Sequence, residues 1–159
     1  MQIRRAVETD IPGIDRCLSQ VLAVHAAGRP DLFVPGTRKY TDPELRGILD
    51  DDLRPVFVAV EEGAEPGAIL GYAFCEVQDF SGSNNMQPIR TLYIDDLCVD
   101  SETRRGHVGS SLYRRVLAWA RENGFHNVTL NVWECNPGAR AFYEAMGMSV
   151  MKTCMEQVL

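Results

Sequence analysis

The stretch from Tyr93 to Leu117 constrains the fold more than any other part of the chain. It begins as an apolar strand, passes through a polar turn with two glycines, and continues as an amphipathic helix. At such a helix N-terminus several backbone N–H groups lack partners, and together with the helix dipole they favour a phosphate or pyrophosphate. Two arginines add positive charge, and two glycines let the backbone approach a ligand. The turn is Arg104-Arg105-Gly106-His107-Val108-Gly109-Ser110. A plain strand-to-helix connection is the alternative interpretation.

A second stretch, from Asn131 to Gly147, reads as the end of a strand followed by a short helix. Asn136 fits the N-cap position and Pro137 fits the first helical turn. Gly147 stands where a left-handed residue commonly ends a helix. The pattern therefore predicts a helix that begins just after Asn136.

Together the two stretches resemble the GNAT superfamily of acetyl-CoA-dependent N-acetyltransferases. The family's pyrophosphate motif, R/Q-x-x-G-x-G/A, is matched by Arg104 and Gly109 and by the following Ser110 and Leu112. His107 departs from it, because it stands where the first motif glycine normally lies. The later pattern N-x-x-A-x-x-F-Y-x-x-x-G is met at every position, by Asn136, Ala139, Phe142, Tyr143 and Gly147.

Length and composition indicate one globular domain, residues 1–159, since 45% of the residues are apolar. The net charge of −6 argues against nucleic acid as a partner. Five cysteines without a C-x-x-C pair predict reduced thiols in the cytoplasm. The charged N-terminus and the lack of a long apolar run argue against secretion and a membrane. The three histidines share no ligand spacing, so no metal is expected.

The expected elements alternate in a way that indicates an α/β fold with a mixed sheet flanked by helices. Helices are expected after Thr9 or Asp10, after Thr41, after the phosphate turn, and after Asn136. Strands are expected at 2–5, 56–61, 68–77, 89–99 and 128–132, and one or two more between Met148 and Leu159 close the sheet. The resemblance implies a mostly antiparallel sheet in which one parallel pair splays apart.

The resemblance also implies where acetyl-CoA, the cosubstrate, would bind. Pantetheine would enter between the splayed strands and pair with the backbone of Leu97, Cys98 and Val99. The pyrophosphate would lie on the turn from Arg104 to Ser110, and Asn136 would orient its helix and contact the coenzyme.

Transfer to an amine requires proton removal, because an alkylamine of pKa ~10.4 is protonated at neutral pH. Asp95 and Asp96 lie on the central strand, and strict alternation predicts that only one of them faces the acceptor. The run Y-I-D-D-L-C-V is similar to Y-L-E-D-L-x-V of polyamine-type acetyltransferases, which favours Asp95 acting through water. Two acids that mark a strand edge or pair with arginines are the alternative.

Tyr143 matches the family's tyrosine that protonates the departing thiolate, and a backbone N–H near Leu97 would hold the oxyanion. Simple core packing of Phe142 and Tyr143 is the alternative. The run H-x-x-x-R-P-D-x-F, with His25, Asp31 and Phe33, is similar to a segment that covers the acceptor pocket in some GNAT proteins. The alternative interpretation of this segment is an ordinary surface loop beside a half-buried histidine.

The expected activity is direct transfer of acetyl to a primary amine on a small molecule, a polyamine-like compound or a peptide. A non-catalytic acyl-CoA-binding or sensing module is the alternative. A nucleotide-phosphate-binding domain is disfavoured, because neither G-x-x-x-x-G-K-[ST] nor G-x-G-x-x-G occurs. The last strands and residues 78–88 are the candidate surfaces for a homodimer.

Overall fold

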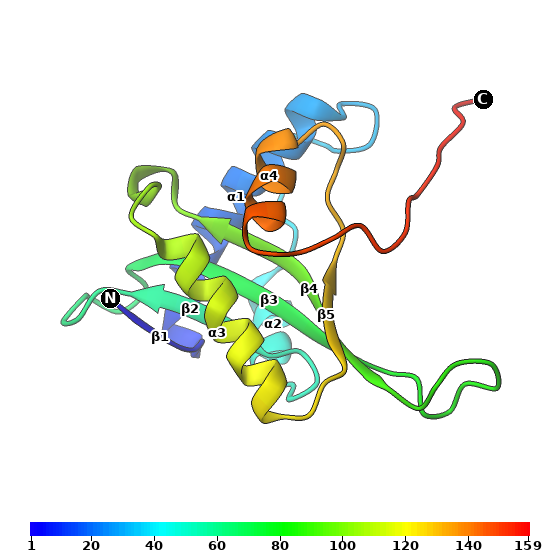
Figure 1. The fold of residues 1–159 in the computed structure, drawn as a ribbon. Helices are drawn as coiled ribbons and strands as arrows, with labels where there is room; N and C mark the ends of the chain where they lie inside the picture. Colours follow the sequence, from blue (N-terminus) through cyan, green and yellow to red (C-terminus); the bar gives the residue numbers. More distant parts are fainter.

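The computed structural model describes residues 1–159, and a five-stranded sheet runs through its middle (Figure 1). The strand order is β1-β2-β3-β4-β5. The first four strands pair antiparallel with their neighbours, whereas β4 and β5 are parallel. The strands are β1 (Gln2–Arg5), β2 (Val56–Val60), β3 (Ile69–Asp79), β4 (Arg90–Val99) and β5 (Asn127–Leu130). The predicted mixed, mostly antiparallel sheet with one parallel pair is confirmed.

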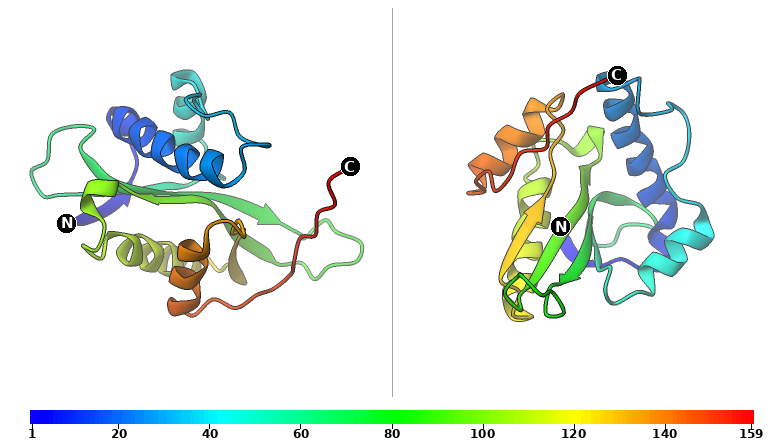
Figure 2. Two further views of the ribbon diagram at one scale, coloured as in Figure 1. Left: turned by 90° about the horizontal axis from the view of Figure 1, so that it is seen from above. Right: turned by 90° about the vertical axis from the view of Figure 1, so that its right-hand side faces the viewer.

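Helices cover both faces of the sheet, as Figure 2 shows edge-on. On one face lie α1 (Ile11–Gly28) and α2 (Asp42–Leu49), and on the other lie α3 (Val108–Glu122) and α4 (Pro137–Ala145). Two short 3-10 turns, Glu8–Asp10 and Ser101–Thr103, precede α1 and follow β4. Each face has its own apolar core, one centred on Ile14, Leu45 and Tyr72 and the other on Leu92, Leu112 and Val116. None of these helices has both the length and the apolar run needed to cross a bilayer.

Local capping signals place two of the helices where they were expected. Thr41 and Glu44 form a reciprocal capping box at the start of α2, with the Glu44 carboxylate 2.6 Å from the Thr41 amide. Asn136 caps α4 by accepting a hydrogen bond from the Ala139 amide at 3.2 Å. Gly147 follows α4 with a φ of 93°, as predicted for the residue that ends it.

Asp10 differs from its expected role as a helix cap. Its carboxylate makes no cap hydrogen bond to α1 and instead accepts two hydrogen bonds from the Arg4 guanidinium, at 2.6 and 2.9 Å. The Asp10 side chain is buried, so an unpaired carboxylate there would be costly, and the arginine on β1 supplies its partner. This pair ties β1 to the start of α1.

Gly13 allows α1 to lie close to the turn that leads into β3. A Cβ at this position would lie 2.2 Å from the carbonyl oxygen of Gly67, which is far too short for any side chain. Only glycine permits this approach of helix to turn. The contact fixes the face of α1 that meets the central strands.

The prediction of closing strands between Met148 and Leu159 is wrong. The chain has no helix or strand after α4, and the segment trails away from the sheet (Figure 1). Its apolar residues come in pairs separated by polar pairs, V-M-K-T-C-M-E-Q-V-L, so neither face of a strand would be apolar. As a result β5 is an edge strand, and it is only half-buried rather than buried as expected.

Candidate active site

Strands β4 and β5 separate partway along their length. Their pairing begins at Thr91 with Asn127 and ends at Ile94 with Leu130. Beyond that point β4 continues to Val99, still paired with β3, while the chain leaves β5 toward α4. The splayed parallel pair implied by the resemblance is therefore present, and one side of β4 has no strand partner there.

The main chain of β4 presents two of the three expected residues to this open side. Asp100 donates its amide hydrogen to the Leu70 carbonyl at 2.9 Å, and the bonding side alternates along an antiparallel strand. Cys98 therefore directs its N–H and C=O toward β3. Leu97 and Val99 direct theirs toward the open side. The expectation that Cys98 also offers its backbone to pantetheine is corrected by this register.

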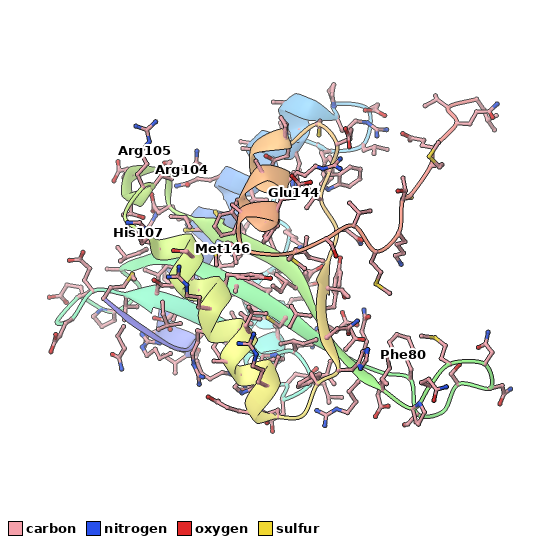
Figure 3. The ribbon with its side chains drawn as sticks, in the orientation of Figure 1. Phe80, Arg104, Arg105, His107, Glu144 and Met146 are labelled. Carbon is pink, nitrogen blue, oxygen red and sulfur yellow. The ribbon has the colours of Figure 1, made fainter.

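The turn before α3 leaves three amides available. Ser111 is the first to donate along the helix, to the His107 carbonyl at 3.0 Å, so the amides of Val108, Gly109 and Ser110 have no backbone acceptor. The Ser110 hydroxyl is already used, because it donates to the His107 carbonyl at 2.9 Å. Arg104, Arg105 and His107 gather around this end of the helix, as Figure 3 shows.

Two residues of this turn adopt a backbone conformation that favours glycine. Arg105 has a φ of 70° and His107 a φ of 60°, and no other non-glycine residue in the chain has a positive φ. His107 thus stands at the position of the first motif glycine. Its backbone lies in the left-handed region, which a glycine adopts without cost. The departure from the family pattern is accommodated as backbone strain.

Gly109 contributes to packing as well as leaving room for a ligand. A Cβ there would lie 3.3 Å from Cγ2 of Val99 and 3.6 Å from Cζ of Phe142. The small residue lets the start of α3 lie against both β4 and α4. Ligand approach was the only role that the sequence indicated.

A β-bulge in β4 places two carboxylates on the same side of the sheet. Phe74 pairs with Asp96 and Cys75 with Ile94, so Asp95 is the extra residue. The ammonium of Lys39 lies 3.0 Å from the Asp95 carboxylate and 3.9 Å from that of Asp96. The prediction that only one acid faces the acceptor side is therefore wrong, because the bulge interrupts the alternation on which it was based.

The two acids differ in burial. The Asp96 side chain is 12% exposed and accepts a hydrogen bond from the Tyr72 hydroxyl at 2.9 Å, whereas Asp95 is 37% exposed. Burial raises the pKa of the Asp96 carboxyl, and Lys39 and Tyr72 only partly offset this. Burial lowers the pKa of Lys39, but Asp96 and Asp95 outweigh it and the net shift is upward.

Aromatic side chains gather on the acceptor side. His25 lies 5.1 Å from Phe33 and 6.2 Å from Trp133, measured between ring centroids, and Phe33 lies 5.4 Å from Trp133. Burial lowers the pKa of His25. The structure thus brings His25 and Phe33 together, with the end of α1 against the segment that follows β5.

Asp31 is not part of this group. Its carboxylate accepts two hydrogen bonds from Arg29, at 2.9 and 2.7 Å, on the exposed surface. Arg29 also pairs with Glu156 at 2.9 Å. No hydrogen bond or ion pair joins Asp31 to Lys39 or to the two acids of β4.

Tyr143 lies on the opposite face of the sheet from the acids. From α4 its partly buried side chain packs against the core beneath α3, with its ring 5.1 Å from Phe142 and 6.0 Å from Tyr113. Burial, and next the negative charge of Asp96, raises the pKa of its phenol. Glu144 of α4 and Met146, which follows this helix, are labelled in Figure 3.

Three side chains at this site were not assigned from the sequence: Lys39, Tyr72 and Trp133. Lys39 had a usable signal, because only it and Lys152 are lysines in a chain with sixteen basic residues. The sequence carries no comparable signal for Tyr72 and Trp133, because their roles depend on which strand and helix pack beside them. No three His, Cys, Asp or Glu side chains gather closely enough to hold a metal ion.

Comparisons with known proteins agree with this geometry. A sequence model of the acetyltransferase (GNAT) family matches residues 22–148. A search of curated protein sequences finds no match. A mutant of the BH1408 protein from Bacillus halodurans superposes with a TM-score of 0.93 at 28% identity, covering 100% of this chain and 99% of that one.

Two more distant structures share the fold. An aminoglycoside acetyltransferase from an uncultured soil metagenomic sample has a TM-score of 0.72 at 20% identity, covering 99% of this chain and 94% of that one. Glucosamine-6-phosphate N-acetyltransferase from Arabidopsis thaliana has a TM-score of 0.67 at 21% identity, covering 99% and 97%. With the family match over most of the chain, these findings lead to one conclusion: the chain belongs to the GNAT family of acetyltransferases.

Proposed function

We propose that the protein transfers acetyl from acetyl-CoA directly to a primary amine, in one step across the open side of β4. The observation that carries this proposal is the early end of the β4–β5 pairing, with acids on one face of the gap and Tyr143 on the other. The unpaired main chain of Leu97 and Val99 and the free amides at the start of α3 fit the pantetheine and pyrophosphate of the coenzyme.

Within this proposal Asp96 removes the amine proton. Its burial supports this role, because a raised pKa brings a carboxylate nearer to the pH at which it must accept a proton. Asp95, favoured by the sequence pattern, holds Lys39 and helps to attract a cationic amine. The Leu97 amide would stabilise the oxyanion, and Tyr143 would protonate the departing thiolate.

The acceptor is a cationic amine of a small molecule or a peptide. With Lys39 charged, the two acids leave the cluster one negative charge in excess, which suits a single ammonium group. His25, Phe33 and Trp133 supply an apolar wall for the rest of that molecule.

The test is acetyl-CoA-dependent thiol release with a panel of amines and peptides, alongside calorimetry with the coenzyme. Tyr143→Phe is expected to lower turnover by roughly 10²–10⁴-fold with affinity for the coenzyme nearly unchanged. Coenzyme binding without turnover on any amine, equally in the wild type and Tyr143→Phe, would instead indicate an acyl-CoA-sensing module.

A further inference from the structure

Lys39 occupies the place where an acceptor amine would have to be. Its ammonium nitrogen lies 3.0 Å from the Asp95 carboxylate and 3.9 Å from that of Asp96. These acids directly precede Leu97, whose main chain faces the open side of β4. Lys39 is one of only two lysines in the chain, and its amine lies beside the proposed base, next along β4 from the proposed thioester position.

The neighbours of Lys39 hold it there. Arg38 pairs with Asp15 of α1 at 2.9 Å and with Asp42 of α2 at 2.7 Å. On the other side, the Tyr40 ring stacks on Phe74 of β3 at 6.1 Å with an interplanar angle of 21°. The segment between α1 and α2 is therefore anchored immediately before and after Lys39.

The choice of lysine matters chemically. Every other ion pair in the structure is made by an arginine. An arginine in this place would give the same charge but would not lose its proton or accept an acyl group, whereas a lysine amine does both.

We propose that Lys39 is acetylated by the protein's own active site, in an intramolecular reaction with bound acetyl-CoA; this rests on the proposed transferase function. The ammonium passes one proton to the Asp95–Asp96 pair and on to solvent. The amine nitrogen forms a C–N bond to the acetyl carbonyl carbon, and the C–S bond of the thioester breaks. Tyr143 gives its proton to the departing sulfur and is reprotonated by the second proton of the nitrogen. The products are acetyl-Lys39 and coenzyme A as its thiol.

The charges around Lys39 oppose this reaction, so it is expected to be slow. The two acids raise the pKa of Lys39 above its ordinary value, so its amine is rarely deprotonated. Acetylation then removes the cation that neutralises Asp95 and Asp96 and leaves an amide in the acceptor position. Turnover on external amines is expected to fall as the modification accumulates.

The chain itself provides the control, because it has only Lys39, exposed Lys152 and the N-terminus as amines. The protein is incubated with acetyl-CoA alone, and intact mass and peptide mapping follow each amine with time. One acetyl group is expected on Lys39, with a first-order rate that does not depend on protein concentration. Lys39→Arg abolishes it, Lys152→Arg leaves it unchanged, and Tyr143→Phe slows it without affecting background acetylation of Lys152.

Three outcomes would overturn the inference while leaving the transferase function intact: an unmodified Lys39 in protein that acetylates an external amine, equal rates at Lys39 and Lys152, or a rate that rises with protein concentration. Absence of any coenzyme binding by calorimetry would overturn the proposed function and this inference together.

Discussion

The buried hydroxyl of Tyr72 on β3 donates a 2.9 Å hydrogen bond to the carboxylate of Asp96 on β4. This bond stabilises the charged form of the acid and so lowers its pKa, against the larger upward effect of burial. The Tyr72 hydroxyl therefore helps to keep the proposed base ionised.

Tyr72→Phe is expected to shift the acid limb of the pH–rate profile to higher pH. Without the donor the pKa of Asp96 rises further, so the base becomes protonated and activity is lost at a higher pH as pH falls. Full profiles of kcat/KM would measure the shift. Tyr113→Phe, which removes a hydroxyl from the other core, is expected to leave the acid limb in place, and an identical shift in both variants would contradict the assignment.

Asp96→Asn is expected to lower kcat by roughly 10²–10⁴-fold, because the amide cannot accept the amine proton. Asp95→Asn keeps Asp96 and is expected to act mainly on KM for a cationic amine, since it removes attraction rather than the base. Steady-state kinetics of the matched pair would separate the two roles. A greater loss of kcat in Asp95→Asn would assign the base to Asp95 instead.

His107→Gly is expected to stabilise the fold by about 1 kcal/mol, because the left-handed φ of 60° is strained for histidine and not for glycine. His107→Ala also removes the imidazole but keeps the Cβ, so it is expected to gain nothing. Urea denaturation of both variants provides the measurement. Equal stabilisation by alanine and glycine would show that the side chain, and not the backbone, is responsible.

Gly13→Ala is expected to destabilise the protein by about 1–3 kcal/mol, because the added methyl group meets the Gly67 carbonyl. Gly47→Ala provides the opposite case. Its Cβ would meet nothing within 4 Å on the exposed side of α2, so the better helix former is expected to stabilise by about 0.5–1 kcal/mol. Thermal unfolding of the two variants should shift in opposite directions.

Much of this fold follows from local signals. The side chains of Thr41 and Asn136 cap the helices that follow them, and Gly147 ends α4. These signals are local, so the sequence alone locates these helix ends well. The ends of the β4–β5 pairing came from family resemblance, because no periodicity specifies where two strands part.

The errors arose where a residue's role depends on a distant partner. The bulge at Asp95 is defined by its register against β3, and so the side on which each acid lies was predicted wrongly. Lys39 reaches those acids only because α1, α2 and β3 anchor its loop. The prediction of strands in the terminal segment was also wrong, because its paired apolar residues do not fit a strand.

The extra residue in β4 also sets how this chain tolerates changes in length. Excising Asp95 would make Ile94 and Asp96 neighbours that pair with Cys75 and Phe74 as they do now, so β4 would pair with β3 without interruption and each flanking residue would keep its side. Leu92 and Ile94 would stay in the core beneath α3, and the carboxylate closest to Lys39 would be lost. The extra residue therefore adds a second carboxylate to this face of the sheet and leaves the core on either side of it undisturbed.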